Sequence, residues 1–139
     1  AAGAEEVVVA DTIGAAAPSA VAELFRQCIT VWRGALVSAH FHDTRAMAIA
    51  NAWAALTQGV RKFDASIGGL GGCPFAPGAA GNLATEDLAL MLQQCGYDTG
   101  IDIGGLRRAV EVAKELVGHR VGGRCSGWLA ALEQRAALA

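Results

Sequence analysis

The chain has 139 residues, of which 53% are hydrophobic and 17% are charged, and its formal net charge is −2 at pH 7. This composition argues against a disordered chain, and the scattered basic residues form no patch for nucleic acid or for an anionic membrane. The apolar runs are too short to span a bilayer and no signal pattern is present, so we expect a folded cytoplasmic protein. The four cysteines form no C-x-x-C pair, which argues against a zinc knuckle or a disulfide scaffold.

The first half of the chain alternates short β-branched runs with helical patterns. The predicted elements are, in chain order, a strand at 6–10, a helix at 18–32, a strand at 35–39, a helix at 44–58 and a strand at 60–65. Polar residues cluster where these strands end, with Asp11 after the first, His40 after the second and Asp64 near the end of the third. Apolar strands that end in polar residues are typical of buried parallel sheets, in which the carboxyl ends of the strands meet at one edge.

A glycine-rich stretch, residues 66–87, separates the third strand from the next helix. Six glycines fall from Gly68 to Gly81; they flank Cys73 on both sides, and Asn82 follows the last of them. Glycine loses more backbone entropy on folding than any other residue, so such a loop usually persists because it bends sharply or approaches a ligand. We therefore predict that this loop belongs to a functional site.

Helical patterns dominate the rest of the chain. We predict helices at 85–95 and 102–117, followed by a terminal helix or a loosely packed tail at 122–139. Thr44, Thr85 and Asp102 are the predicted N-caps of three helices.

Repeated strand and helix units indicate a parallel sheet covered by helices. The loop DTIGAAA after the first strand has one glycine and lacks the dinucleotide-binding fingerprint, which weakens the doubly wound alternative. A complete eight-stranded α/β barrel needs about twice this length. We therefore predict an α/β chain that forms one half of such a barrel.

Two histidines and one asparagine have the residue types of a metal site. His40 and His42 are two residues apart at a predicted strand end, so both imidazoles point to one face. Asn82 offers an amide oxygen, and a carboxylate from elsewhere would complete a shell suited to Mn²⁺ or Mg²⁺ more than to Zn²⁺. The alternative is that the two histidines make structural hydrogen bonds.

Three further residues are candidates for acid or base chemistry. Cys73 stands among glycines, a setting that favours an exposed sulfur with a mobile proton; the alternative is an inert residue before Pro74. Asp11 and Glu86 lie at a strand end and a helix start, where a cap or a solvated charge is the default interpretation. The same default applies to the remaining carboxylates near these ends, Asp43, Asp64 and Asp87.

Three motifs carry a family resemblance: VADTIG at 9–14, HFHDT at 40–44 and FDASIGGLGGCPFAPGAAGNLATEDL at 63–88. They closely resemble the 3-hydroxy-3-methylglutaryl-CoA (HMG-CoA) lyases, metal-dependent lyases built on a (β/α)8 TIM barrel. The resemblance covers about residues 7–116, and the cysteine loop separates it from synthases that share only the H-x-H element. It implies the C-terminal half of the barrel, about strands five to eight, at 1–118 and a helical tail at 119–139.

The resemblance also implies a reaction and roles for single residues. The family cleaves HMG-CoA, or a related 3-hydroxyacyl-CoA, to acetyl-CoA and acetoacetate or a related keto acid, a step of leucine degradation. The implied ligands of a divalent Mg²⁺ or Mn²⁺ ion are His40, His42 and Asn82. The implied catalytic residues are Cys73, Asp11, Glu86 and His40. The implied partners are an acyl-CoA substrate and further copies of the chain in a homo-oligomer.

The sequence departs from the family in two respects. The family's first strand supplies an aspartate ligand and a neighbouring arginine, and this sequence holds neither motif. We therefore expect a truncated or cleaved portion, inactive alone, whose sheet edges are covered by a missing N-terminal half-barrel or another chain. The segment HDTRAMA lacks the tyrosine and glycine that are common after the threonine, which leaves the acyl group of the substrate open. A Claisen-type condensing synthase and a non-catalytic half-barrel module remain as alternatives.

Overall fold

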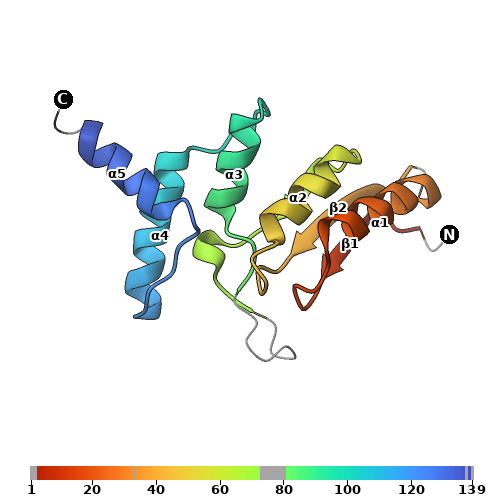
Figure 1. Cartoon of the computed structure of the whole chain (residues 1–139), viewed down its shortest axis with the longest axis horizontal. Helices are drawn as coiled ribbons and strands as arrows, with labels where there is room; N and C mark the ends of the chain where they lie inside the picture. Colours follow the sequence, from red (N-terminus) through yellow and green to blue (C-terminus); the bar gives the residue numbers. More distant parts are fainter. Residues whose placement is uncertain (1–2, 33, 73–80, 137, 139) are drawn as a thin grey trace. The chain divides into compact units, whose positions relative to one another are not determined.

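The structure, a computed structural model, describes residues 3–32, 34–72, 81–136 and 138. It divides into two compact units, each of which is described by itself. Unit 1 comprises Ala1–Ala65 and Gly71–Leu83, and unit 2 comprises Ser66–Leu70 and Ala84–Ala139. The three strands of the described residues belong to unit 1, whereas the described elements of unit 2 are helical (Figure 1).

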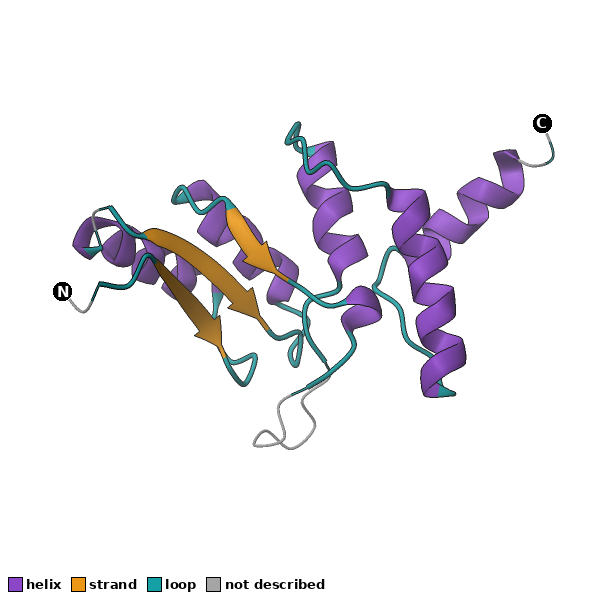
Figure 2. Cartoon of the chain, turned by 180° about the vertical axis from the view of Figure 1, so that it is seen from behind, coloured by secondary structure: helices purple, strands orange, loops and turns teal. Residues whose placement is uncertain are grey.

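Unit 1 is a parallel sheet with helices between its strands. Its elements are β1 (Glu6–Asp11), α1 (Pro18–Val31), β2 (Leu36–Phe41), α2 (Ala48–Thr57) and β3 (Lys62–Asp64). The strands pair in the order β1-β2-β3, both pairs are parallel, and the two helices lie on one face of the sheet (Figure 2). The predicted α/β class is confirmed. The carboxyl ends of the strands therefore meet at one edge, as expected for helical crossovers.

The core of unit 1 lies between this sheet and its two helices. The Phe25 ring of α1 meets the Phe41 ring of β2 edge to face, with centroids 6.2 Å apart. Alanines such as Ala52 and Ala55 on α2 are fully buried, so this helix packs closely. Burial of one phenylalanine side chain stabilises a fold by about 1.5–3 kcal/mol, so the two rings help to fix the strand that carries His40.

A network of polar side chains joins the three strands of unit 1. The Ser38 hydroxyl donates to Glu6 Oε1 at 2.7 Å, and Lys62 Nζ pairs with Glu6 Oε2 at 2.7 Å. The network therefore links all three strands, because these residues come from β2, β1 and β3 in turn. It lies two residues before His40 and Asp64 along their strands.

The described residues of unit 2 form four helical segments. They are η1 (Ile67–Gly69), α3 (Thr85–Gln94), α4 (Ile103–Val117) and α5 (Ser126–Ala136). Helix α4 is the central element, because it contacts η1, α3 and α5. Its buried side chains Val110 and Ala113 lie seven and ten residues after Ile103, which is helical spacing. No helix in the described part of the chain is long and apolar enough to cross a membrane.

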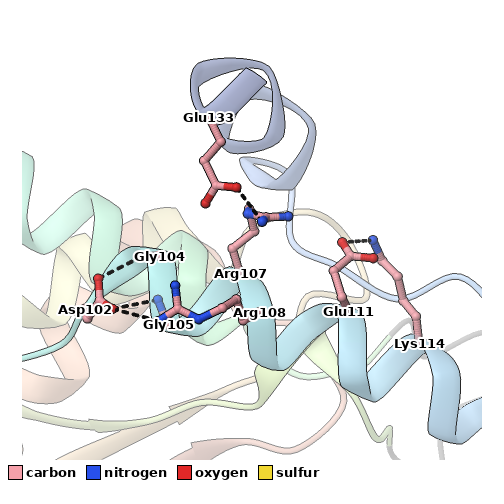
Figure 3. A network of polar contacts seen from close by, with 8 residues as sticks. All are labelled: Asp102, Gly104, Gly105, Arg107, Arg108, Glu111, Lys114 and Glu133. Atoms are coloured by element: carbon pink, nitrogen blue, oxygen red, sulfur yellow. Dashed lines mark hydrogen bonds and ion pairs between the residues drawn. The ribbon is translucent and has the colours of Figure 1, made fainter. Parts of the chain in front are cut away.

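Polar contacts fix both the start and the flank of α4 (Figure 3). The Asp102 carboxylate accepts hydrogen bonds from the amides of Gly104 at 3.0 Å and Gly105 at 2.9 Å, so the predicted Asp102 cap is confirmed. Arg107 of α4 forms an ion pair with Glu133 of α5. This pair joins the last two helices of the chain.

Two predicted caps are wrong. Helix α2 begins at Ala48 and not at residue 44, because Asp43 Oδ1 accepts the Ala48 amide at 2.9 Å and the loop between them contains Ala46 at φ 56°. The residue before α3 is Ala84, and the Thr85 amide donates to the Ser66 carbonyl at 2.9 Å. Backbone pairing determines the start of α3, so Thr85 is its first residue and not its cap.

Candidate functional site

The strand ends of unit 1 bring together three of the predicted site residues. Asp11 is the last residue of β1, His40 is the second-to-last residue of β2, and His42 follows that strand. Residues 81–83 run antiparallel to this end: Asp43 donates its amide to the Gly81 carbonyl at 3.1 Å, and Leu83 donates to Phe41 at 3.0 Å. The bridge pairs His42 with Asn82, so the sequence-distant Asn82 lies beside the histidines.

The two imidazoles lie against each other. Their ring centroids are 4.8 Å apart and the ring planes are inclined at 76°. The His42 Nδ1 atom is 3.0 Å from the Asp11 carbonyl oxygen, and His42 is buried. The His40 Nδ1 atom contacts Asp64 Oδ1. Both rings therefore use Nδ1 within the protein, which leaves Nε2 of each as the nitrogen for a ligand.

Asp11 supports this arrangement through both its side chain and its backbone. Its carboxylate oxygens accept the amides of Ala15 at 2.9 Å and Ala16 at 3.0 Å, which closes the loop before α1. Its carbonyl faces His42. Asp11 thus fixes the loop and the neighbouring imidazole, and a direct part in the reaction stays a prediction.

Glycines permit the close approach of chain segments at this edge. Gly71 has φ 95°, and a Cβ atom there would lie 2.8 Å from Asn82 Nδ2. Gly14 has φ 64°, and a Cβ atom there would lie 2.6 Å from Thr44 Oγ1. Both positions need glycine on two grounds, because an L side chain would be strained and would also collide. Gly71 belongs to the predicted glycine-rich loop, and Cys73 lies outside the described residues.

Glu86 lies in unit 2, in the first turn of α3, and is only 1% exposed. Its carboxylate accepts the amides of Gly68 at 3.0 Å and Gly123 at 2.6 Å. These bonds join α3 to two segments that are distant in sequence. The observed contacts are structural, and a catalytic part for Glu86 stays a prediction.

The donor set at the strand ends fits a divalent cation in chemical type. Two imidazole nitrogens and an amide oxygen form a mixed shell of the kind that Mn²⁺ accepts. The described residues contain no group of three or more His, Cys, Asp or Glu side chains that could hold a metal by themselves. A cation bound by His40, His42 and Asn82 would thus need at least one further ligand from elsewhere.

Sequence reasoning missed Asp64 as part of this site, because a carboxylate at a strand end was interpreted as a cap or a solvated charge. In the paired strands, Asp64 is the Cα partner of His40. The available signal was that two neighbouring strands each end in a titratable residue, which parallel pairing brings together.

Comparisons with known proteins identify the family of the chain. The HMGL-like family profile matches residues 1–113. The chain is 54% identical over 101 residues to hydroxymethylglutaryl-CoA lyase of Pseudomonas mevalonii, which covers 73% of this chain and 34% of that protein. It is 45% identical over 117 residues to (R)-citramalyl-CoA lyase of Chloroflexus aurantiacus, which covers 84% of this chain and 37% of that protein.

Solved structures match in fold as well. The HMG-CoA lyase of Bacillus subtilis superposes with a TM-score of 0.85 at 39% identity, over 92% of this chain and 43% of that chain. An HMG-CoA lyase of Acinetobacter baumannii in complex with coenzyme A and 3-methylmalate gives a TM-score of 0.82 at 38% identity, over 88% and 40% of the two chains. The chain thus spans 34–43% of the length of these four proteins. On sequence and fold together, it belongs to the HMGL-like family and has the α/β architecture of part of an HMG-CoA lyase barrel.

Proposed function

We propose that this chain is the metal-binding part of an acyl-CoA lyase that cleaves HMG-CoA to acetyl-CoA and acetoacetate. The observation that carries the proposal is the pair of imidazoles, each bonded through Nδ1, beside Asn82 at the strand ends of a family barrel. The 54% identity to a lyase of this name supports the same reaction.

In the proposed reaction, the C3 hydroxyl of the substrate loses its proton and the bond between C2 and C3 breaks. The electron pair of that bond passes to the thioester side as an enolate, C3 becomes the ketone carbon of acetoacetate, and the enolate takes up a proton to give acetyl-CoA. A divalent cation, Mg²⁺ or Mn²⁺, held by His40, His42 and Asn82 would supply charge stabilisation and orient the substrate oxygens.

The residues of this chain have separate tasks in the proposal. His40 and His42 offer Nε2 as ligands, and Asp11 holds His42 in place through its carbonyl. Cys73 is the proposed acid that protonates the enolate, in keeping with its place in the glycine-rich loop. The proposed parts of His40 in proton transfer and of Glu86 in activity rest on the family resemblance.

The proposal includes a partner segment for the sheet. Among the described strands, β1 and β3 each pair on one side only. Exposed strand edges favour pairing with further strands, so an N-terminal half-barrel is the partner that we propose. A homo-oligomer and a cytoplasmic location belong to the same proposal.

A chimera tests this function. The chain replaces the aligned segment of the Pseudomonas mevalonii lyase, so that the relative supplies the rest of the barrel. We expect Mn²⁺-dependent release of acetyl-CoA from HMG-CoA, and loss of that release in the matched chimera carrying His42→Ala. A folded chimera that binds Mn²⁺ but cleaves nothing would overturn the assignment, and a folded chimera that binds no Mn²⁺ would favour the non-catalytic module.

Substrate choice is the second question for the same chimera. A relative of this chain at 45% identity is named as an (R)-citramalyl-CoA lyase. In this chain the Arg45 Nε atom donates to the Gly14 carbonyl at 3.1 Å, which ties the loop after β2 to the loop after β1. Because of that relative, the chimera is assayed with citramalyl-CoA as well as with HMG-CoA. The ratio of the two kcat/KM values identifies the preferred acyl group.

A further inference from the structure

We propose that Asp64 is a positioning residue for His40: its carboxylate accepts the Nδ1–H of His40 and so fixes Nε2 as the nitrogen offered to a cation. The inference rests on the proposed function, because it takes His40 as a metal ligand. It concerns one contact, the Asp64 Oδ1 atom against His40 Nδ1.

Strand pairing places this contact. His40 of β2 and Asp64 of β3 are Cα partners in the parallel register, so both side chains leave the sheet side by side. Ser38 and Lys62 are partners one pleat earlier on the same strands. The contact is therefore set by the register of two neighbouring strands.

Asp64 has no competing structural task in the described part of the chain. His40 is its only side-chain hydrogen-bond partner there, and Asp64 caps no helix. This distinguishes it from Asp43, which accepts the amide of Ala48 at 2.9 Å, and from Asp11, which holds two loop amides. The default interpretation of a strand-end carboxylate as a cap therefore fails for Asp64.

The chemistry of the pair sets the tautomer. An ionised carboxylate only accepts hydrogen bonds, so the His40 Nδ1 atom must be the donor, and the neutral ring then carries its lone pair on Nε2. Carboxylate, histidine and metal commonly form such a triad, in which the carboxylate orients the ring and raises its strength as a ligand. His42 is held in the same tautomer by the neutral Asp11 carbonyl. The hydrogen-bond acceptor of His40 is a side chain, whereas that of His42 is a backbone carbonyl. A side-chain substitution can therefore remove the acceptor of His40 but not that of His42.

The experiment compares Asp64→Ala with Asp64→Asn in the chimera described above, by calorimetric titration of Mn²⁺. We expect Asp64→Ala to weaken Mn²⁺ binding about 10–100-fold, as loss of such partners usually does. Asp64→Asn retains an acceptor oxygen without the charge, so its loss should be smaller. Glu6→Gln is the matched control, because it removes a carboxylate from the same sheet without touching His40, and its Mn²⁺ affinity should be unchanged.

A second measurement determines the tautomer of the His40 ring in the absence of metal. The ¹⁵N shifts of the His40 ring in the 139-residue chain identify the protonated nitrogen, and we expect the Nδ1–H tautomer to give way to a mixture in Asp64→Ala. Unchanged Mn²⁺ affinity or an unchanged tautomer in that variant would overturn the positioning role while the proposed metal site stands. A folded chimera that binds no Mn²⁺ even with Asp64 in place would instead refute the metal site, and this inference with it.

Discussion

Acidic side chains serve different ends in the two units. In unit 2, Glu86 is 1% exposed and its oxygens are bonded to backbone amides, so the carboxylate is part of the core. In unit 1, Asp64 has an exposed side chain and meets the ring of His40. A buried carboxylate needs hydrogen-bond donors within the protein, because it has lost its contact with water. An exposed carboxylate at a strand end does not need them and can orient a neighbouring histidine. The site should therefore be sought at the strand ends of unit 1.

The largest effect should come from removing a proposed ligand. His42→Ala in the chimera should lower kcat/KM for HMG-CoA by about 10³-fold, because a metal supplies several kcal/mol of transition-state stabilisation. Steady-state kinetics at saturating Mn²⁺ measures this. His119→Ala is the control, since His119 is exposed in unit 2 and its ring, within the described part of the chain, contacts the neighbouring Arg120 carbonyl. Equal activity of both variants would contradict the metal site.

Removing the buried carboxylate of unit 2 should act on stability. Glu86→Ala leaves the amides of Gly68 and Gly123 without their acceptor, and each unsatisfied buried donor costs about 1–3 kcal/mol. We expect a total loss of about 2–6 kcal/mol in the free energy of unfolding by urea. Glu111→Ala is the matched control on α4, where the exposed pair with Lys114 should contribute less than about 1 kcal/mol. Undiminished stability of Glu86→Ala would show that water replaces the carboxylate.

The sequence predicted the elements of both units because their hydrophobic patterns are local. The β-branched run at 6–10 and the apolar spacing after Pro18 needed no knowledge of neighbours, and the structure has β1 and α1 there. The spacing of His40 and His42 likewise predicted rings on one side, and their rings are in contact. The hydrophobic pattern of a single element could therefore be predicted, whereas the caps of α2 and α3 could not.

The contacts that support the site could not be predicted, because they depend on pairing between distant segments. Asp64 meets His40 only through the register of β2 and β3. The acceptor for His42 is a backbone carbonyl, which no residue type marks. The burial of Glu86 was equally hidden, since a carboxylate in the first turn of a helix looks the same in sequence whether it is exposed or buried.

Cys95 and Cys125 offer a smaller contrast, between an exposed and a half-buried thiol. Burial raises the pKa of the Cys125 thiol to about 12, and the nearby Asp87 carboxylate adds to the rise. A pKa this high leaves very little of the Cys125 thiolate at pH 8, so iodoacetamide should label the exposed Cys95 far faster. Asp87→Asn should speed the labelling of Cys125 by up to about tenfold, because it removes the negative charge. Peptide mass spectrometry reads each cysteine separately, and equal rates at Cys95 and Cys125 would contradict this.

The smallest effect concerns the polar network beneath the site. Hydrogen bonds from Lys62 and then from Ser38 hold the pKa of the Glu6 carboxyl below its ordinary value of 4.5. A pKa that is lower in the folded state stabilises the protein above the unfolded value, and this stabilisation disappears as the pH falls through the folded value. Lys62→Met should therefore lower the melting temperature at pH 7 and have little effect once the pH is well below 4.5.

Ser38→Ala should give the same trend with a smaller amplitude, because Ser38 is the lesser of the two causes. Thermal melts between pH 7 and the acid limit measure both variants. A melting-temperature difference for Lys62→Met that persisted unchanged in acid would assign the effect to packing of the lysine stem and not to charge. Glu6 would then have a structural role, as Glu86 has in unit 2. Asp64, beside His40, would remain the carboxylate that orients a proposed metal ligand.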